Sequence, residues 1–171
     1  FPKMIEDDLH RSLEVDRVDL INLFSNTSFA MASQDVRYYL NGLLVEITQN
    51  GIRTVATDGH RLALADVAFA NKDAVDVSMI IPRKGVLELL KLLAASDDKT
   101  VHLSIGNNGI GVTVGSQIMK IKLLEGNFPD YKRVIPKESN NFMLANREEL
   151  KSVLTRTSIL SNEKFRGIRL T

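Results

Sequence analysis

A short polar stretch between two apolar runs holds the densest group of side chains that could do chemistry in this chain. Within five residues it places a hydroxyl, a carboxylate, an imidazole and a guanidinium, on Thr57, Asp58, His60 and Arg61. The flanking runs, 53–57 and 61–67, alternate in polarity, and Asp-Gly between two such runs is a strong hairpin signal. We therefore expect a tight hairpin that closes on Asp58-Gly59. Its polar tip is either an uncommitted solvated turn, the commoner case, or a binding surface.

An enzyme centred on this tip would lack several parts. The sequence offers no nucleophile elbow, no second carboxylate at a set distance and no cysteine. The three histidines are scattered, without the spacing of metal ligands, at His10, His60 and His102. Three glycines that could suggest a phosphate cradle lie inside alternating strands, where turns and bulges explain them better: Gly109, Gly111 and Gly115. We therefore expect no catalytic residue, no metal and no cofactor, and a His60 enzyme is the least favoured hypothesis.

The overall composition is that of an ordinary globular domain. The chain has 171 residues, 44% of them hydrophobic and 25% charged, and 22 Lys and Arg against 21 Asp and Glu give a net charge of +1. Such a balance provides no general attraction to nucleic acid or to anionic membranes, so any basic surface must be local. The absence of cysteine fits a reducing compartment. With no apolar run of about 18 residues and no leader pattern, we expect a soluble, intracellular protein that does not bind membranes.

The elements that must hold the hairpin follow an order that recurs along the chain. Asp16 is a good N-cap, and apolar residues follow it at helical spacing. The first copy is predicted to be a short strand, a helix and three strands, over residues 12–15, 16–31, 36–48, 51–57 and 61–69. The second copy repeats this order, with Pro82 in the first turn of its helix, over residues 76–81, 82–95, 101–105, 110–114 and 118–124.

A third copy begins near residue 141. Residues 142–145 are predicted to be extended, Asn146 caps a helix that runs to about residue 160, and a strand is expected over 165–171. The first strands of the copies begin about 65 residues apart, which indicates an internal repeat. We therefore predict an α+β fold of repeated β-α-β-β-β units, with two helices packed on antiparallel sheets in each domain.

Domain boundaries follow from this repeat. The stretch 126–139, which contains Pro129 and Pro136, is the predicted junction. We expect residues 1–9 to be a linker or the tail of a preceding domain, 10–129 to form one complete domain, and 130–171 to begin a further, truncated one.

Two segments have the composition of binding surfaces. Residues 34–40, QDVRYYL, combine an amide, a guanidinium and two adjacent phenols, and on a strand only one of Tyr38 and Tyr39 could face the core. The pair Arg83-Lys84 stands at the start of the second helix, where the helix dipole disfavours cations. A solvated helix start is the simpler explanation. With Lys91 on the same helix, the pair is also suited to bind phosphates.

Five motifs follow one another along the chain: YYLNGLL, RTVATDGHRLALADV, IIPRKGVLELLKLL, EGNFPDYKRVIP and SNEKFRGIRL. In this order and spacing, they closely resemble the beta subunit of bacterial DNA polymerase III, the sliding clamp. The resemblance covers essentially the whole chain, as the end of a first clamp domain, the middle domain and the start of the third. It implies the DNA clamp fold, with two helices per domain facing inward and sheets facing outward.

The resemblance also implies a function. Two subunits of such clamps close head to tail into a homodimeric ring around double-stranded DNA and tether the replicative polymerase without catalysing a reaction themselves. Because a closed ring cannot leave DNA sideways, weak phosphate contacts independent of sequence suffice. Implied partners are the catalytic subunit of DNA polymerase III, the clamp loader, other polymerases, and mismatch-repair or ligase proteins with short clamp-binding motifs. The implied location is the bacterial cytoplasm, at the nucleoid.

Two sets of residues carry over by resemblance. The DNA-binding set is Gln34, Arg37, Tyr38, Tyr39, Arg83 and Lys84. The peptide-cleft set is Leu40, Thr57, Gly59, His60, Arg61, Leu62, Pro129, Arg133, Val134 and Phe165. Simple core packing is the alternative role for the set's Leu, Val and Phe members. A DNA-independent scaffold that binds peptides is the alternative function.

Overall fold

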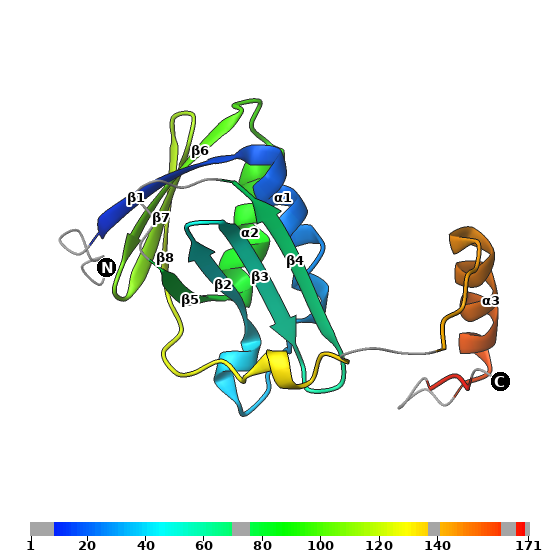
Figure 1. Cartoon of the computed structure of the whole chain (residues 1–171). Coiled ribbons are helices and arrows are strands. Elements are labelled where there is room, and N and C mark those ends of the chain that lie inside the picture. Colours follow the sequence, from blue (N-terminus) through cyan, green and yellow to red (C-terminus); the bar gives the residue numbers. More distant parts are fainter. Residues whose placement is uncertain (1–8, 70–75, 137–140, 162–166, 170–171) are drawn as a thin grey trace. The chain divides into compact units, whose positions relative to one another are not determined.

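The computed structural model describes residues 9–69, 76–136, 141–161 and 167–169 (Figure 1). The chain divides into two compact units, Phe1–Pro129 and Asp130–Thr171. The predicted fold class, α+β, is confirmed, because the structure combines helices with two antiparallel sheets.

The first unit holds two four-stranded antiparallel sheets. One has the order β1-β6-β7-β8, formed by Leu9–Asp16, Thr100–Gly106, Gly109–Val114 and Gln117–Lys122. The other has the order β4-β3-β2-β5, formed by Leu62–Ala68, Gly51–Thr57, Gly42–Thr48 and Val77–Pro82. The first strand of each half-repeat therefore pairs in the sheet of the other half: β1 with β6, and β5 with β2. This exchange interlocks the two halves.

Two helices lie side by side in this unit (Figure 1), α1 (Arg17–Ser25) and α2 (Arg83–Ala94). Asp16 caps α1 as predicted, because its Oδ1 accepts a hydrogen bond from the Val18 N–H at 2.7 Å. The apolar face of α2 is buried through Val86, Leu89 and Leu93, in one core cluster with residues of both sheets. The apolar residues that recur at positions i, i+3 and i+7 thus form the face through which the helix packs on the sheets.

The first helix is shorter than the predicted range 16–31. It ends at Ser25, and a short 3₁₀ helix, η1 (Ser28–Ala30), follows. The cause is Thr27, which is fully buried and donates from its hydroxyl to the Leu23 carbonyl at 2.7 Å, while Thr54 of β3 donates to the same carbonyl at 3.1 Å. Contacts with a strand distant in sequence thus fix the end of α1.

The strand predicted over 36–48 begins only at Gly42. The preceding residues form a 3₁₀ helix, η2 (Tyr38–Asn41), closed by the Leu40 N–H donating to the Arg37 carbonyl at 2.8 Å. At the second helix, Pro82 is the N-cap and the last residue of β5, and not a first-turn residue as predicted. The other strands of this unit agree with the predicted ranges to within a few residues at each end.

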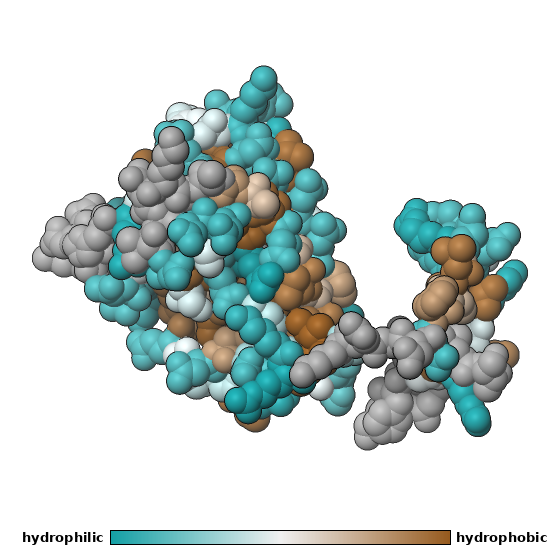
Figure 2. All heavy atoms as spheres, viewed as in Figure 1, coloured by the Kyte–Doolittle hydropathy of each residue, from teal (hydrophilic) through white to brown (hydrophobic). Residues whose placement is uncertain are grey.

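The second unit contains the 3₁₀ helix η3 (Tyr131–Arg133) and the helix α3 (Arg147–Ile159). Asn146 caps α3 as predicted, accepting hydrogen bonds from the N–H groups of Glu148 and Glu149. No strand occurs among the described residues of this unit, so the strand that opens the third copy is absent at 142–145. Of the strand predicted over 165–171, residues 167–169 have no regular structure and the rest lies outside the described residues. Apolar residues lie at the surface of this unit (brown in Figure 2).

Candidate functional site

The hairpin tip predicted from the sequence is built by β3 and β4. The last pair of the ladder joins Thr57 to Leu62, so the tip comprises residues 58–61, and the prediction that Arg61 begins the second strand is wrong. Asp58 Oδ1 accepts hydrogen bonds from the N–H groups of His60 at 2.9 Å and Arg61 at 3.0 Å. Such side-chain bonds to the local backbone replace the ladder and shape a defined turn.

The charges at the tip are paired. Arg61 Nε donates to Asp58 Oδ2 at 3.1 Å, its Nη2 donates to the Phe29 carbonyl at 2.7 Å, and its guanidinium lies over the Phe29 ring. Partial burial raises the pKa of Asp58, but the hydrogen bonds from His60 and Arg61 outweigh it and lower the pKa overall. The Asp58 carboxylate is therefore a structural acceptor and a weak base, and it does not suit proton transfer at neutral pH.

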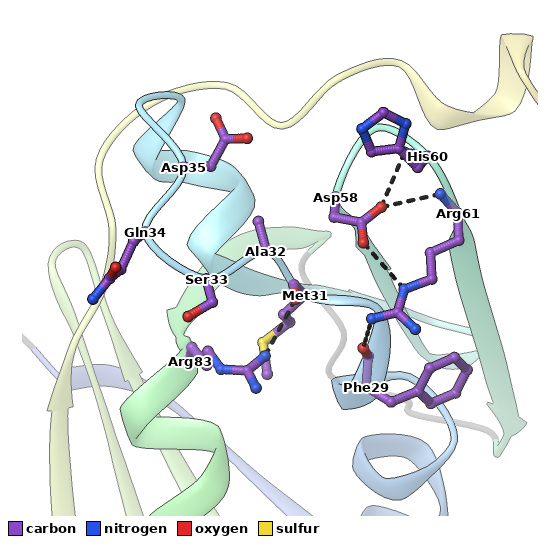
Figure 3. Close-up of a pocket in the computed structure, with 10 residues that line it drawn as sticks. All are labelled: Phe29, Met31, Ala32, Ser33, Gln34, Asp35, Asp58, His60, Arg61 and Arg83. Atoms are coloured by element: carbon purple, nitrogen blue, oxygen red, sulfur yellow. Dashed lines mark hydrogen bonds and ion pairs between the residues drawn. The ribbon is translucent and has the colours of Figure 1, made fainter. Parts of the chain in front are cut away.

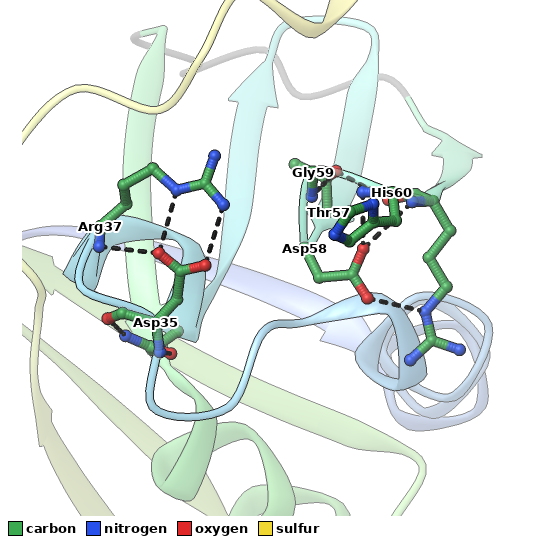
Figure 4. A network of polar contacts seen from close by, with 8 residues as sticks. Asp35, Arg37, Thr57, Asp58, Gly59 and His60 are labelled. Atoms are coloured by element: carbon green, nitrogen blue, oxygen red, sulfur yellow. Dashed lines mark hydrogen bonds and ion pairs between the residues drawn. The ribbon is translucent and has the colours of Figure 1, made fainter. Parts of the chain in front are cut away.

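The loop before β2 carries a second ion pair, between Asp35 and Arg37 (Figure 4). Arg37 Nε and Nη2 donate to the two carboxylate oxygens at 2.9 and 2.8 Å. These bonds, with one from the Arg37 N–H, lower the pKa of Asp35 to about 2, and the carboxylate raises the pKa of Arg37. The adjacent Gln34 has a positive φ of 61°, which is uncommon outside glycine. The loop therefore holds a fixed conformation beside the hairpin.

The loop and the hairpin tip border one open hollow of about 470 Å³ (Figure 3). It is lined by Phe29, Met31, Ala32, Ser33, Gln34, Asp35, Asp58, His60, Arg61 and Arg83. Arg83 reaches it from the first turn of α2 and donates to the Met31 carbonyl at 3.2 Å. The structure thus brings two members of the predicted DNA-binding set, Gln34 and Arg83, together with His60 and Arg61 of the peptide-cleft set.

The other members of the DNA-binding set are at the surface. Lys84 is exposed in the first turn of α2, whereas Lys91 on the same helix is paired with Glu88 at 2.9 Å. Tyr38 is 53% exposed and Tyr39 is half-buried, and their rings make an edge contact with centroids 5.8 Å apart. The expectation that the two tyrosines lie on a strand is wrong, because both lie on the 3₁₀ helix η2.

The rest of the peptide-cleft set is divided between the units. In the first unit, Leu40 is only 2% exposed, as in core packing, Leu62 is half-buried and Pro129 is exposed. In the second unit, Arg133 and Val134 are both exposed, and Arg133 pairs with Asp130 at 2.8 Å. Phe165 lies outside the described residues.

Sequence reasoning missed part of the hollow. The missed lining residues are Phe29, Met31, Ala32, Ser33 and Asp35. Asp35 stands two positions before Arg37 inside QDVRYYL, a spacing that suits a local ion pair. This spacing was the only signal in the sequence for any of the missed residues.

Within the described residues, no group of three or more His, Cys, Asp or Glu side chains could hold a metal ion. No described helix has the length and apolarity needed to span a membrane.

Two interlocked half-repeats, each with one helix over antiparallel strands, define this unit as a domain of the DNA sliding-clamp class. Comparison with known families agrees. The model of the DNA polymerase III beta subunit central domain matches residues 14–130, and that of its C-terminal domain matches residues 132–171. The chain belongs to the DNA polymerase III beta subunit family, the beta sliding clamps, and the predicted resemblance is confirmed.

Individual relatives support this assignment. The chain is 44% identical to the beta sliding clamps of Pseudomonas putida and Escherichia coli, over 99% of its own length and 46% of theirs. It thus spans about half the length of the curated relatives it matches. Among solved structures, it is similar to the beta subunit of Pseudomonas aeruginosa, with a TM-score of 0.91 and 41% identity over 96% of this chain and 45% of that one. It is also similar to a Pseudomonas aeruginosa clamp solved bound to griselimycin, with a TM-score of 0.89 and 42% identity over 97% and 45% of the two chains.

Proposed function

We propose that the chain forms part of a ring-shaped sliding clamp that encircles double-stranded DNA and tethers the replicative polymerase for processive synthesis. The proposed ring is a homodimer closed head to tail, and its role is not catalytic. The observation that carries the proposal is the match of the two clamp domain families to nearly the whole chain, residues 14–130 and 132–171. Its proposed place of action is the bacterial cytoplasm, at the nucleoid.

The charge distribution supports the DNA part of this proposal. A net charge of +1 is too small for strong general attraction to DNA, but a closed ring needs only weak contacts that do not depend on sequence. Lys84 is exposed at the start of α2, Arg83 precedes it in the first turn of the same helix, and Arg37 is exposed in the loop before β2, so these cations can reach phosphates. The proposed DNA-binding set is Gln34, Arg37, Tyr38, Tyr39, Arg83 and Lys84.

The hairpin tip supports the protein-docking part. A rigid tip with exposed polar groups beside half-buried Leu62 suits an extended peptide whose apolar anchors need walls and whose backbone needs partners. We propose that the tip binds short segments of partner proteins; the resemblance assigns Pro129, Arg133, Val134 and Phe165 to the same peptide-cleft set. The proposed partners are the catalytic subunit of DNA polymerase III, the clamp loader, other polymerases, and mismatch-repair and ligase proteins.

Fluorescence anisotropy with a labelled duplex and with a labelled peptide tests both parts. The peptide carries a glutamine followed by leucine and phenylalanine anchors. We expect the double variant Arg83→Ala/Lys84→Ala to weaken duplex binding and to lower the slope of log affinity against log salt by about 2, because each phosphate contact adds roughly one to that slope. Peptide binding should be unchanged.

A matched control removes two exposed lysines elsewhere, in the variant Lys99→Ala/Lys122→Ala. It changes the net charge equally and should leave the salt slope nearly unchanged. Equal slopes for both double variants, or no duplex binding at low salt, would contradict the DNA assignment. Peptide binding without any duplex binding would instead support the alternative, a DNA-independent scaffold.

A further inference from the structure

One contact joins the loop before β2 to the hairpin tip: the Arg37 guanidinium lies against Gly59. An ideal Cβ built on Gly59 would be 3.2 Å from Nη2, 3.4 Å from Nη1 and 3.7 Å from Cζ of Arg37. Because Nη1 and Nη2 are both nearer than Cζ, the edge of the guanidinium that carries these two nitrogens faces Gly59. Gly59 also has a φ of +88°, in the left-handed region that favours glycine. The tip therefore has a shape that leaves room for Arg37 above it.

Asp35 determines where this guanidinium lies (Figure 4). Its two carboxylate oxygens accept bonds from Nε and Nη2 of Arg37, and Oδ1 also accepts from the Arg37 N–H at 2.8 Å. A planar guanidinium held by two parallel bonds cannot rotate without breaking one of them. Asp35 is itself fixed, since its N–H donates to Asn41 Oδ1 at 2.9 Å and its carbonyl accepts from Asn41 Nδ2 at 2.8 Å.

Part of the guanidinium remains available to a ligand. The bonds to Asp35 use Nε and Nη2, and the structure assigns no partner to Nη1 among the described residues. Arg37 is also 49% exposed. The same side chain thus belongs to the proposed DNA-binding set through its free donors, and supports the proposed peptide site through Gly59.

We propose that Asp35 is a positioning residue that divides the Arg37 guanidinium between these two tasks. It holds the guanidinium against the hairpin tip, which preorganises the tip for a peptide, and its negative charge weakens the attraction of the same guanidinium for phosphate. This inference rests on the proposed function. Loss of the Asp35 charge therefore changes the two affinities in opposite directions, whereas loss of a merely structural residue weakens both or neither.

The test is Asp35→Asn, which keeps the shape of the side chain and removes its charge. In the anisotropy assays with the duplex and the clamp-binding peptide, we expect the peptide Kd to rise about fivefold, because the Arg37 guanidinium no longer holds a fixed position against the tip. The duplex Kd should fall about two- to threefold at low salt, because one negative charge beside a phosphate-binding guanidinium is gone. Arg37→Ala should weaken both ligands, since it removes the cation and the cover together.

The matched control is Asp66→Asn. Asp66 holds Arg53 with the same two-bond geometry, Nε to Oδ1 at 2.6 Å and Nη2 to Oδ2 at 3.3 Å, and this pair lies on β3 and β4 away from the tip. The control makes the same change in net charge, and it should leave peptide binding unchanged and duplex binding nearly so.

Each outcome decides between the hypotheses. If the wild-type chain binds both ligands and Asp35→Asn leaves peptide affinity unchanged or weakens both, the inference is overturned and the proposed function stands. If Asp66→Asn lowered the duplex Kd by the same factor as Asp35→Asn, the change would be a general charge effect, and this result would also overturn the inference. If the wild-type chain binds neither ligand, the proposed function fails first and the inference fails with it.

Discussion

Replacing Gly85 by alanine should destabilise the first unit, although alanine is the better helix former. Gly85 is buried in the first turn of α2, and an ideal Cβ there would lie 2.8 Å from Cγ2 and 3.3 Å from Cδ1 of Ile121 on β8. The Cγ2 methyl is bonded directly to a β-branched carbon whose rotation is restricted, so it cannot move aside alone. The added methyl group therefore forces α2 away from β8.

The size of the effect follows from two opposing contributions. Extra carbon in a packed core costs about 1–3 kcal/mol. Alanine in place of glycine in a helix interior contributes about 1 kcal/mol, and less in a first turn. We therefore expect a net loss of about 1 kcal/mol in the free energy of unfolding, seen in urea with circular dichroism as a lower midpoint at constant slope.

The control for this prediction is the same substitution in an Ile121→Ala background. There both crowding atoms are absent, and Gly85→Ala should raise the free energy of unfolding by about 0.5 kcal/mol through helix propensity alone. Opposite signs in the two backgrounds would support the packing argument. A stabilising effect in the wild-type background, or an equal loss in both, would refute it.

The remaining predictions concern a buried hydroxyl, a carboxylate and the hairpin tip. Thr54→Val keeps the shape of the side chain but removes the donor to the Leu23 carbonyl, and urea unfolding should show a loss of about 1 kcal/mol; an unchanged midpoint would argue against this bond. The stabilising effect of ionised Asp35 should be complete above the ordinary pKa of 3.8 and lost as the pH falls through about 2. Carboxyl NMR should place the wild-type midpoint there and nearer 3.8 in Arg37→Ala, and similar midpoints would contradict the pairing. His60→Ala should weaken peptide binding and spare duplex binding, and the reverse pattern in anisotropy assays would exclude His60 from the peptide site.

The fold was largely predictable because its signals are local. Alternating residues in Thr100–Gly106 and the helical repeat in Arg83–Ala94 each leave one apolar face, and burying these faces in a single core requires the observed sheets and helices. The end of α1 was not predictable in this way. It depends on Thr27 meeting Thr54, a residue of another element, and no local pattern encodes that contact.

The candidate site was predictable in its parts but not in its arrangement. Asp-Gly and the polar residues around it indicate the hairpin tip, and the resemblance to sliding clamps supplies the two residue sets. The contact between Arg37 and Gly59 joins segments separated in sequence. Arg37 directly precedes the 3₁₀ helix η2, whereas a strand was predicted there, and a strand would direct the Arg37 side chain elsewhere. The spacing of Asp35 and Arg37 indicates at most a local ion pair, and the position of Asp35 beside the tip could not be predicted, because it depends on hydrogen bonds with Asn41.

Retention on circular DNA tests the clamp proposal most directly. Residues 1–171 would replace the matching segment of the Pseudomonas putida clamp, and the ring would be loaded by that organism's clamp loader onto nicked circular DNA, with the parent clamp as positive control. The complex is then challenged with high salt before and after the circle is linearised. We predict retention on the circle and rapid loss from the linear form, because a ring leaves DNA only over an end. Loss from both forms at the same salt concentration, with the parent retained, would contradict the proposal.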